Sequence, residues 1–519
     1  MVLNEQGMKR ILILLLAAFL LAFIYSCNQV TNEEIKVADT SYPLIPQPVQ
    51  ISYSPGHFTI TEKTGIFCPS FLVETASLAA EQLGISKPVN TGRKRNGIFL
   101  SIDTSLHREE YNLMVHRRKI EITGGSGNGV YYAIQTLRQL TGTEALSSEV
   151  PCVSVSDFPR FSWRGLMLDC SRTYQSPEYI KKTIDRISYY KMNVLHLHLT
   201  DDQGWRIEIK SHPELTQKGA IFHAEYNEPE SHQGFYSQDE MKDIIRYAGS
   251  KGVTIVPEIE MPGHSTAILV CYPELSCTGK IADKVFPFFK GPGVTPDILC
   301  AGNEETFALI QDVIDEIVEV FPSEFIHIGG DEAPKVRWEK CPKCQKRIRD
   351  EGLSDEKEFQ SYFISRVEKY INSKGRRLIG WSEIIEGGLA PNAAVMDWIG
   401  GAKEATEKGQ DVVMSPTSHC YFDYPYTSIN SERAYSFDPV KDLSEEQSGH
   451  ILGLQANFWS HIDREPELVD KQLFPRLLSI AERGWSHSNV TDWDSFRKRL
   501  EKHLYILQQM GINYYKDDI

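Results

Sequence analysis

Two adjacent carboxylates are the most conspicuous chemical feature of this sequence. In the stretch FIHIGGDEAPK (325–335), a β-branched and aromatic run ends at Gly329 and Gly330, and Asp331 and Glu332 follow directly. Paired carboxylates can act as general acid and base, yet neighbours on a strand point to opposite faces of a sheet. Both can therefore serve one site only where the chain leaves strand geometry, which two glycines allow.

Other acidic, basic and aromatic residues stand at comparable positions, each just after a strand-like run. They are Arg172, Asp201-Asp202, Glu260 with His264, Trp381 with Glu383, Trp398, Tyr421 with Asp423, and Trp459 with His461. Any one of them has an ordinary explanation, because acidic residues often cap helices and a single Trp more often packs in a core. Eight such positions together indicate one shared site. Carboxylates combined with aromatic rings are typical of a carbohydrate site.

The elements that must position these residues repeat from Phe158 onward as strand, loop and helix. The strand-like runs are WRGLMLDCS, NVLHLHLT, VTIVPEIE, FIHIGG, RRLIGW, AVMDW, DVVMSP and ILGLQANFW. The early runs are almost continuously apolar, as in strands that are buried on both faces. We therefore predict an α/β fold, a (β/α)8 TIM barrel over 158–519, with its functional residues at the C-terminal ends of the strands. A final amphipathic helix should pack on the outside of the barrel, and a doubly wound open sheet is the alternative fold.

Residues 43–157 have a different pattern, with short strand-like segments around two helix-like ones. No convergent acidic or histidine residues occur there. We interpret this part as a small α+β accessory domain.

The N-terminus has the order of a secretory signal. Lys9 and Arg10 precede the apolar run ILILLLAAFLLAFIY, and Ser26-Cys27 follows. A small residue before Cys resembles the bacterial lipoprotein cleavage box, which predicts a signal peptide over 1–27, lipid on Cys27 and a flexible tether over 28–42. The protein would then be exported and anchored to the bacterial (outer) membrane, on its periplasmic or cell-surface side. A retained signal anchor is the alternative.

The net charge of −15 argues against nucleic acid as a partner and against electrostatic attachment to anionic lipid. Among the ten cysteines, Cys341-Pro-Lys-Cys344 has the spacing of half a zinc site or of a redox pair. No second close Cys or His pair accompanies it, so we expect ordinary structural roles. Cys271, Cys277 and Cys300 flank a loop and could form a disulfide in an oxidising compartment.

Metal-dependent hydrolysis is a second chemistry that the sequence could support. His196-Leu-His198 resembles the metal-binding pair of barrel amidohydrolases, but that class has its pair after the first barrel strand and further His ligands after later strands. Here the pair lies within the second strand, and the neighbouring loops offer no ligand set beyond His264. We expect neither a metal nor a cofactor.

Several stretches resemble the family 20 glycoside hydrolases, the β-N-acetylhexosaminidases. They are RFSWRGLMLDCSR, NVLHLHLTDDQGWRIEI, PEIEMPGHS, HIGGDEAPKVRW, GWSEI and LGLQANFW, in this order between about Pro151 and Trp485. The preceding domain looks like that family's usual N-terminal companion. The resemblance implies an exo-acting enzyme that removes a non-reducing terminal β-linked GlcNAc or GalNAc from a glycan with retention of configuration.

The resemblance also implies how two consecutive acids divide the work. In the common retaining scheme two carboxyl groups face each other about 5–5.5 Å apart, whereas family 20 is a substrate-assisted exception. The substrate's own 2-acetamido oxygen attacks the anomeric carbon and closes an oxazolinium ring. Asp331 would hold the acetamido N–H, and Glu332 would protonate the leaving oxygen and later deprotonate water. Because the acid must keep its proton, we expect the ionised Asp331 to raise the pKa of Glu332.

Other rim residues receive roles from the same resemblance. Asp201 and His264 would form a relay that positions Glu332, and Tyr421 would hydrogen-bond the acetamido carbonyl. The sugar would be bound by Arg172 at its 3- and 4-hydroxyls, by Asp423 at its 6-hydroxyl side, and by Trp381, Trp398 and Trp459 as walls.

Two positions depart from the family pattern. His461 stands where an acidic residue usually contacts the corner of the 4- and 6-hydroxyls, and Thr173 replaces a residue, often His, after the sugar-binding Arg. A potential cation at His461 leads to the hypothesis that 6-sulfated GlcNAc is accepted. A disaccharide-releasing enzyme similar to a lacto-N-biosidase and a non-catalytic surface glycan-binding lipoprotein are the remaining alternatives. The sequence does not indicate the oligomeric state.

Overall fold

The computed structural model describes residues 42–86, 89, 96–141, 148–291 and 293–519. The predicted signal peptide, the lipidation site Cys27 and the tether up to residue 41 lie outside these residues. In the described part of the chain, no helix has the length and apolarity needed to cross a lipid bilayer.

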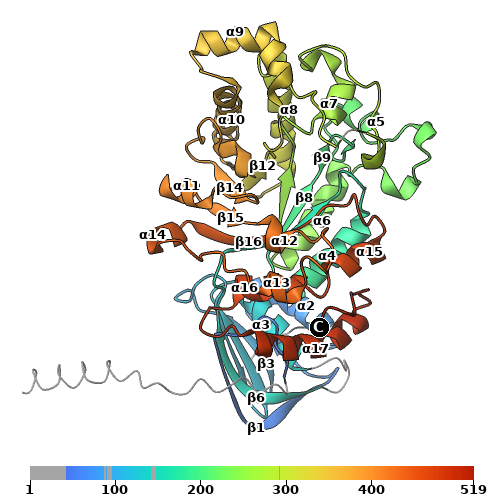
Figure 1. Ribbon diagram of the computed structural model, residues 1–519. Coiled ribbons are helices and arrows are strands. Elements are labelled where there is room, and N and C mark those ends of the chain that lie inside the picture. The colour runs from blue at the N-terminus through green and yellow to red at the C-terminus, as the bar shows by residue number, and fades with distance from the viewer. Residues whose placement is uncertain (1–41, 87–88, 90–95, 142–147, 292) are drawn as a thin grey trace, which may run out of the picture. The chain divides into compact units, whose positions relative to one another are not determined.

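The first part of the described chain is a six-stranded sheet with two helices on it (Figure 1). The strand order is β1-β6-β4-β5-β3-β2, mostly antiparallel, with β2, β3 and β5 parallel. The elements are β1 (Gln50–Ile60), β2 (Ile66–Phe67), α2 (Val73–Gln82), β3 (Gly97–Ile102), β4 (Tyr111–Val115), β5 (Lys119–Gly124), α3 (Gly127–Leu140) and β6 (Ser148–Asp157). This agrees with the α+β character predicted for 43–157.

Eight parallel strands follow and close into a barrel in the order β7-β8-β11-β12-β13-β14-β15-β16 (Figure 1). Their bounds are β7 (Trp163–Asp169), β8 (Val194–His198), β11 (Thr254–Glu258), β12 (Phe325–His327), β13 (Arg377–Trp381), β14 (Ala394–Asp397), β15 (Val412–Met414) and β16 (Ile451–Phe458). Each lies within one of the eight predicted runs, and β16 pairs with β7 to close the ring. The prediction of a (β/α)8 barrel is thus confirmed, and the open sheet is wrong.

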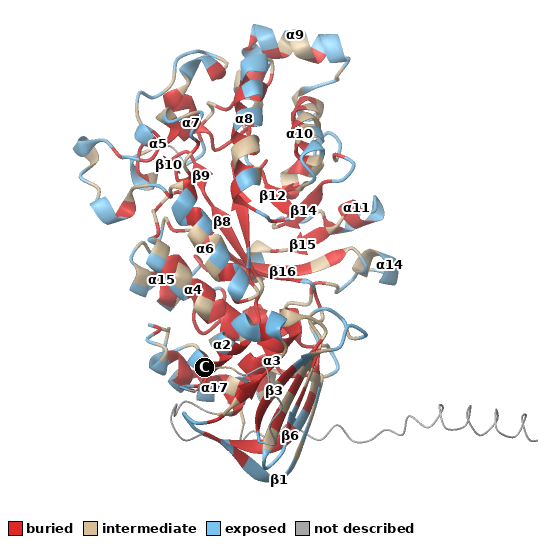
Figure 2. Ribbon diagram, turned by 180° about the vertical axis from the view of Figure 1, so that it is seen from behind, coloured by how far each residue is buried: buried red, intermediate tan, exposed pale blue. Residues whose placement is uncertain are grey.

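Helices surround the barrel and bury their apolar faces against it (Figure 2). The longer ones are α4 (Pro177–Tyr189), α6 (Gln238–Ser250), α8 (Glu304–Val320), α9 (Pro342–Glu351), α10 (Glu356–Ser373), α16 (Leu477–Trp485) and the final α17 (Trp493–Gln509). The shorter ones are α5 (Glu214–Gln217), α7 (Thr266–Cys271), α11 (Ala402–Glu407), α12 (Thr417–Cys420), α13 (Ser431–Tyr435), α14 (Glu445–Ser448) and α15 (Pro466–Leu473).

Side-chain caps fix where several of these helices begin. Ser237 and Glu240 form a capping box at α6, and Asp355 accepts from two backbone N–H groups at α10. At α4 Ser176 caps and Pro177 follows at the first helical position, where its missing N–H costs nothing. Fixed helix starts in turn fix the loops between strand and helix, which carry the site.

Two apolar clusters stabilise the barrel. The larger lies between strands and helices, and it includes Phe496 and Leu500 of α17, which confirms the predicted position of the last helix. The smaller fills the barrel interior with side chains such as Trp163, Phe325 and Met396. The barrel is therefore a packed core, and only its rim is open to a ligand.

The small domain and the barrel share buried polar contacts. Trp485 of α16 lies in the core of the small domain and donates its indole N–H to Asp157 at 3.0 Å. The Lys191 ammonium lies 2.9 Å from the same carboxylate. Arg164 of β7, fully buried, pairs with Glu109 at 3.0 Å. The region 42–519 forms one compact unit.

Candidate active site

A pocket of about 350 Å³ lies at the C-terminal ends of the barrel strands. It brings together ten of the fourteen predicted rim residues, from seven of the eight strand ends, and Asp202, Glu260 and Glu383 are not among its lining residues. The lining comprises Arg172, His264, Phe288, Gly293, Val294, Asp331, Glu332, Trp381, Trp398, Tyr421, Asp423, Tyr424, Trp459 and His461. Asp201 does not line the pocket, because it lies 1% exposed behind His264 and Arg172.

The backbone after β12 explains how two consecutive carboxylates reach one pocket. Gly329 and Gly330 have φ of 66° and 91°, and Glu332 itself has φ of 42°, in the left-handed region that residues with a Cβ rarely adopt. A Cβ on Gly329 would lie 1.6 Å from a carboxylate oxygen of Glu260. The glycine pair is therefore required by close approach as well as by conformation. Strained backbone of this kind persists where the surrounding structure determines it, commonly at functional sites.

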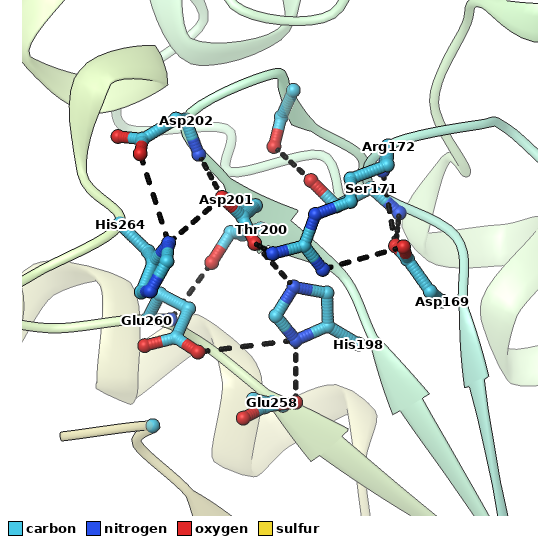
Figure 3. A network of polar contacts seen from close by, with 12 residues as sticks. Asp169, Ser171, Arg172, His198, Thr200, Asp201, Asp202, Glu258, Glu260 and His264 are labelled. Atoms are coloured by element: carbon cyan, nitrogen blue, oxygen red, sulfur yellow. Dashed lines mark hydrogen bonds and ion pairs between the residues drawn. The ribbon is translucent and has the colours of Figure 1, made fainter. Parts of the chain in front are cut away.

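A charged network lies behind the pair and fixes His264 (Figure 3). The imidazole Nδ1 lies 3.1 Å from Asp201 Oδ1, and its Nε2 lies 3.4 Å from Glu332 Oε2 and 3.7 Å from Asp331 Oδ2. Burial alone would lower the pKa of His264, but Asp201 raises it well above its usual value. The imidazole is therefore protonated and shares its positive charge between Asp201 and Glu332.

Arg172 belongs to the same network (Figure 3). Its guanidinium lies 2.7 Å from Asp201 and 3.4 Å from Asp169, and it stacks over the Trp459 ring at 4.7 Å. Burial by itself would raise the pKa of Asp201, yet Arg172 and His264 hold it well below its usual value. Asp201 thus connects the arginine on one side of the pocket to the histidine beside Glu332.

Glu258, at the end of β11, is a buried hub that the sequence analysis missed. Its carboxylate lies 3.1 Å from His196, 2.9 Å from His327 and within ion-pair distance of His198. It also accepts the Trp381 indole N–H at 2.7 Å. The hub therefore fixes the rotamer of a tryptophan that forms one wall of the pocket.

The same contacts answer the metal-dependent alternative. His196 and His198 are 0% exposed, lie beneath the pocket and do not line it. The two ring nitrogens of His198 face Glu258 and Asp201, which raise its pKa to about 10 although burial alone would lower it. A catalytic metal needs an open coordination position, which this buried pair does not present to the pocket.

The protonation of the acid pair differs from the sequence expectation. Burial, opposed by His264 and aided by nearby carboxylates, raises the pKa of Asp331 to about 7. The pKa of Glu332 is lowered instead, first by its contact with His264. The prediction that Asp331 raises the pKa of Glu332 was wrong, because the side chain of Asp331 is only 12% exposed and that of Glu332, beside an imidazolium, is 45% exposed. In the free pocket below about pH 7, Asp331 is therefore the member of the pair that carries the proton.

This raised pKa makes a stability prediction for Asp331→Asn. The folded-state pKa of Asp331, about 7, lies above its unfolded value. The free energy of unfolding therefore has its full contribution from this group at low pH, and that contribution is lost as pH rises from about 4 to 7. The amide does not ionise, so the variant should be more stable than the parent at pH 8, by on the order of 2–4 kcal/mol. The difference should shrink towards zero near pH 4. Thermal melts from pH 4 to 8 measure it, with the exposed Asp312→Asn as control; a gap that is independent of pH would contradict the raised pKa.

Aromatic rings form the walls of the pocket. Trp381 and Trp459 lie with ring centroids 5.9 Å apart, and Trp398 stacks on Tyr421 at 6.0 Å with an interplanar angle of 18°. The Trp398 indole N–H donates to Glu383 at 2.8 Å, which holds that ring in place. Burial, together with Asp331, raises the pKa of Tyr421 well above its usual value, so its hydroxyl stays protonated. The result is a narrow apolar cup that has carboxylates and one phenol at its base.

His461 also lines the pocket, and its ring is tilted against the Phe288 ring at a centroid distance of 4.5 Å. Burial and the neighbouring Arg172 lower its pKa. The imidazole is therefore neutral at neutral pH, which removes the cation on which the 6-sulfate hypothesis was based. Asp423 lines the same pocket, and burial raises its pKa to about 7.

Other lining residues had no signal in the sequence. Phe288, Gly293 and Val294 belong to the long loop between α7 and α8, which has no periodic pattern, and Tyr424 follows Asp423 in a short turn. A larger cavity, about 450 Å³, lies at the other end of the strands beside Trp163, Phe325 and Arg377. Functional residues of such barrels lie at the C-terminal rim, so we assign the chemistry to the smaller pocket.

Comparisons with known proteins agree with this geometry. The family described as glycosyl hydrolase family 20, catalytic domain, matches residues 161–488, and domain 2 of the same family matches residues 41–158. A β-hexosaminidase of Porphyromonas gingivalis is 40% identical over 95% of this chain and 67% of its own length. One of Vibrio furnissii is 32% identical over 87% of this chain and 78% of its own length.

Solved structures give the same result. The exo-β-N-acetylglucosaminidase of Vibrio harveyi in complex with N-acetylglucosamine superposes with a TM-score of 0.82 at 30% identity, covering 92% of this chain and 78% of that one. The β-N-acetylhexosaminidase of Bacteroides fragilis gives 0.80 at 33% identity, covering 91% and 96%.

Proposed function

Because the chain belongs to glycosyl hydrolase family 20, we propose that it is an exo-β-N-acetylhexosaminidase. It would remove a non-reducing terminal β-linked GlcNAc or GalNAc from glycans, with retention of configuration and with help from the substrate's own acetamido group. The partner is thus a glycan that ends in an N-acetylhexosamine.

One observation carries this proposal. Asp331 Oδ1 is buried in the pocket and has no hydrogen-bond partner among the described residues. An unpaired buried acceptor costs free energy, roughly 1–3 kcal/mol. An acetamido N–H of the bound sugar supplies the donor, whereas a 2-hydroxyl sugar lacks the length and the N–H to reach it in the same way. The site is therefore built for a 2-acetamido sugar.

Substrate binding also supports the exchange of the proton between the two acids. The N–H bond to Asp331 favours its ionised form, which lowers its pKa. The Glu332 side chain is 45% exposed in the free pocket. The bound sugar and its leaving group cover it, and burial raises the pKa of a carboxyl group. Both changes move the shared proton from Asp331 to Glu332, where the leaving oxygen needs it.

The first chemical step then follows. Tyr421 donates its hydroxyl proton in a hydrogen bond to the acetamido carbonyl and aligns the oxygen with the anomeric carbon. Glu332 gives its proton to the glycosidic oxygen as that bond breaks, and the acetamido oxygen closes the oxazolinium ring. Asp331 stabilises the positive charge, and the walls Trp381, Trp398 and Trp459 exclude water.

In the second step Glu332, now ionised, takes a proton from water that attacks the anomeric carbon and opens the ring. Two inversions give overall retention. His264, held by Asp201, positions Glu332 throughout, and Arg172 is oriented by Asp169 and Asp201 to bind sugar hydroxyls.

Pocket size favours release of a single sugar over release of a disaccharide. About 350 Å³ is near the lower end of ligand pockets, which span roughly 300–1,000 Å³. The aromatic walls surround this volume, so the pocket accommodates one terminal residue.

A product panel tests the function. Incubation with β-linked GlcNAc and GalNAc oligosaccharides should release the terminal monosaccharide, first as the β-anomer in a proton NMR time course. A 6-sulfated aryl GlcNAc should turn over more slowly than the plain sugar, because His461 is neutral and Asp423 shares the pocket. Release of disaccharides, binding without turnover, or faster hydrolysis of the sulfated sugar would each contradict one of these statements.

We propose further that the protein is exported and anchored by lipid on Cys27, on the strength of the apolar run and Ser26-Cys27. Metabolic labelling with radioactive palmitate should mark the parent and not Cys27→Ser; equal labelling of both would reject the anchor.

A further inference from the structure

Four cysteines from three separate segments of the chain lie close together outside the pocket lining. They are Cys277, Cys300, Cys341 and Cys344. We propose that they bind one structural zinc ion, which fastens both ends of the pocket loop, here defined as residues 278–299, to the segment that follows the acid pair.

The distances between the sulfur atoms fit a tetrahedral metal. Cys300 Sγ lies 3.7 Å from Cys341 Sγ and 3.6 Å from Cys344 Sγ, and Cys277 Sγ lies 3.7 Å from Cys344 Sγ. All four lie within 4.8 Å of one another. A tetrahedron with Zn–S bonds of about 2.3 Å has sulfur–sulfur edges of about 3.8 Å. The cluster is thus already near the size that a single zinc ion requires.

The same distances differ from those of a disulfide. A bonded pair has an S–S separation of about 2.05 Å, and all nine described cysteines have free thiols. Cys300 is almost equally distant from two other sulfurs, so no single pairing is favoured. The expectation of a disulfide among Cys271, Cys277 and Cys300 is therefore not met, and Cys271 instead donates its thiol to the Glu214 carbonyl.

Backbone contacts hold the ligands in this arrangement. Ser276 and Leu299 form an antiparallel bridge, and the Cys300 N–H donates to the Leu275 carbonyl at 2.8 Å. These contacts bring Cys277 and Cys300 together although 22 residues separate them in sequence. The Trp338 indole N–H donates to the Leu299 carbonyl at 2.9 Å, which ties the third segment to the first two.

Close packing at Gly302 supports the same conclusion. A Cβ at this position would lie 2.4 Å from the backbone nitrogen of Cys344, so only glycine lets the two ligand segments approach. Cys300, Cys341 and Cys344 are at most 4% exposed, and Cys277 is partly exposed at the edge. Four closed sulfur ligands are typical of structural zinc sites, and catalytic sites keep a position open.

The position of the cysteines at the two ends of the pocket loop indicates what the metal would do. The pocket loop carries Phe288, Gly293 and Val294, which line the sugar pocket, and Phe288 packs against His461. Cys277 and Cys300 flank this loop on its two sides. A metal bound to both of them, and to Cys341 and Cys344, fixes the base of the loop relative to Asp331 and Glu332. We expect the metal to affect sugar binding, while the chemistry remains with the acids.

Metal analysis of the purified full-length chain tests the proposal. Inductively coupled plasma mass spectrometry should find one zinc ion per chain. The double variant Cys341→Ser/Cys344→Ser should contain at least about tenfold less zinc. Cys271→Ser is the matched control, since it changes a buried cysteine in the same region outside the cluster, and it should keep its zinc. Loss of zinc should raise KM for an aryl GlcNAc more than it lowers kcat.

A second measurement uses only the parent protein, so it tests the proposal even where the double variant does not fold. Zinc removed from the parent by a chelator and replaced by Co²⁺ should give the visible absorption bands of tetrahedral cobalt with thiolate charge transfer. Absence of bound metal, iron in place of zinc, two disulfides found by non-reducing mass spectrometry, or equal zinc loss in Cys271→Ser would overturn the proposal. The metal readout does not depend on turnover, and the KM comparison alone rests on the proposed function.

Discussion

An aryl β-glycoside with a 2-hydroxyl group in place of the 2-acetamido group will be hydrolysed at least about 10⁵-fold more slowly than the matched N-acetyl sugar. The reason is that the acetamido oxygen is the nucleophile, and well-oriented intramolecular groups have effective molarities of roughly 10⁵–10⁸ M. Without the acetamido group, the nucleophile that attacks the anomeric carbon must be a water molecule or a carboxylate of the enzyme.

The geometry around Asp331 sharpens this expectation. Its carboxyl group has a pKa raised to about 7 and lies next to Glu332 in the turn that follows β12, not across the scissile bond from it. A 2-hydroxyl sugar also leaves the buried Asp331 Oδ1 unpaired. The measurement is kcat/KM for two aryl glycosides with the same leaving group. Rates within tenfold of each other would show that the enzyme supplies its own nucleophile.

Glu332→Gln should lower kcat by about 10²–10⁴-fold, the usual contribution of a general acid and base. The amide keeps the size of the side chain and can still face His264, so folding and sugar binding should change little. The loss should be smaller for an aryl leaving group that departs without a proton than for an oligosaccharide, because only the latter needs the acid in the first step.

Glu339→Gln is the matched control, since it changes an exposed glutamate in the segment that follows the pair and outside the pocket. It should leave kcat and KM unchanged. Full turnover of oligosaccharides by Glu332→Gln would remove Glu332 from the mechanism and would favour a different proton donor.

The fold could be predicted because the barrel strands are short apolar runs that alternate with loops and helical patterns. The same regularity predicted that Arg172, Asp331, Tyr421 and Trp459 share a rim, since all parallel strands end on one side of a barrel. Local chemistry at Gly329 and Gly330 predicted the departure from strand geometry. These features depend on neighbours in sequence, which a sequence shows directly.

The rest depends on contacts between segments that are distant in sequence. Glu258 looks like one acid in an apolar strand, and only the closed barrel surrounds it with three histidines and Trp381. The predicted order of the pKa values of Asp331 and Glu332 was wrong, because the two side chains differ in exposure and in distance from His264.

The four-cysteine cluster was not predicted from the sequence for a similar reason. Spacing rules search for two close pairs, whereas Cys277 and Cys300 are joined by a backbone bridge between Ser276 and Leu299. Phe288 and Val294 lie in a loop without periodicity, so nothing in the sequence marks them as pocket residues.

The buried contacts of Asp157 have a consequence for how this protein can be dissected. Lys191 and Trp485, both from the barrel, have polar partners in the small domain: both contact the Asp157 carboxylate at the end of β6, and the Lys191 ammonium also donates to the Tyr111 hydroxyl at 2.8 Å. A shortened chain that starts after Asp157 would expose to water the Trp485 ring, which lies in the apolar core of the small domain, and an exposed apolar patch of this kind favours aggregation. Truncation at the junction should therefore yield insoluble material, and calorimetry of the intact chain should record a single melting event for residues 42–519.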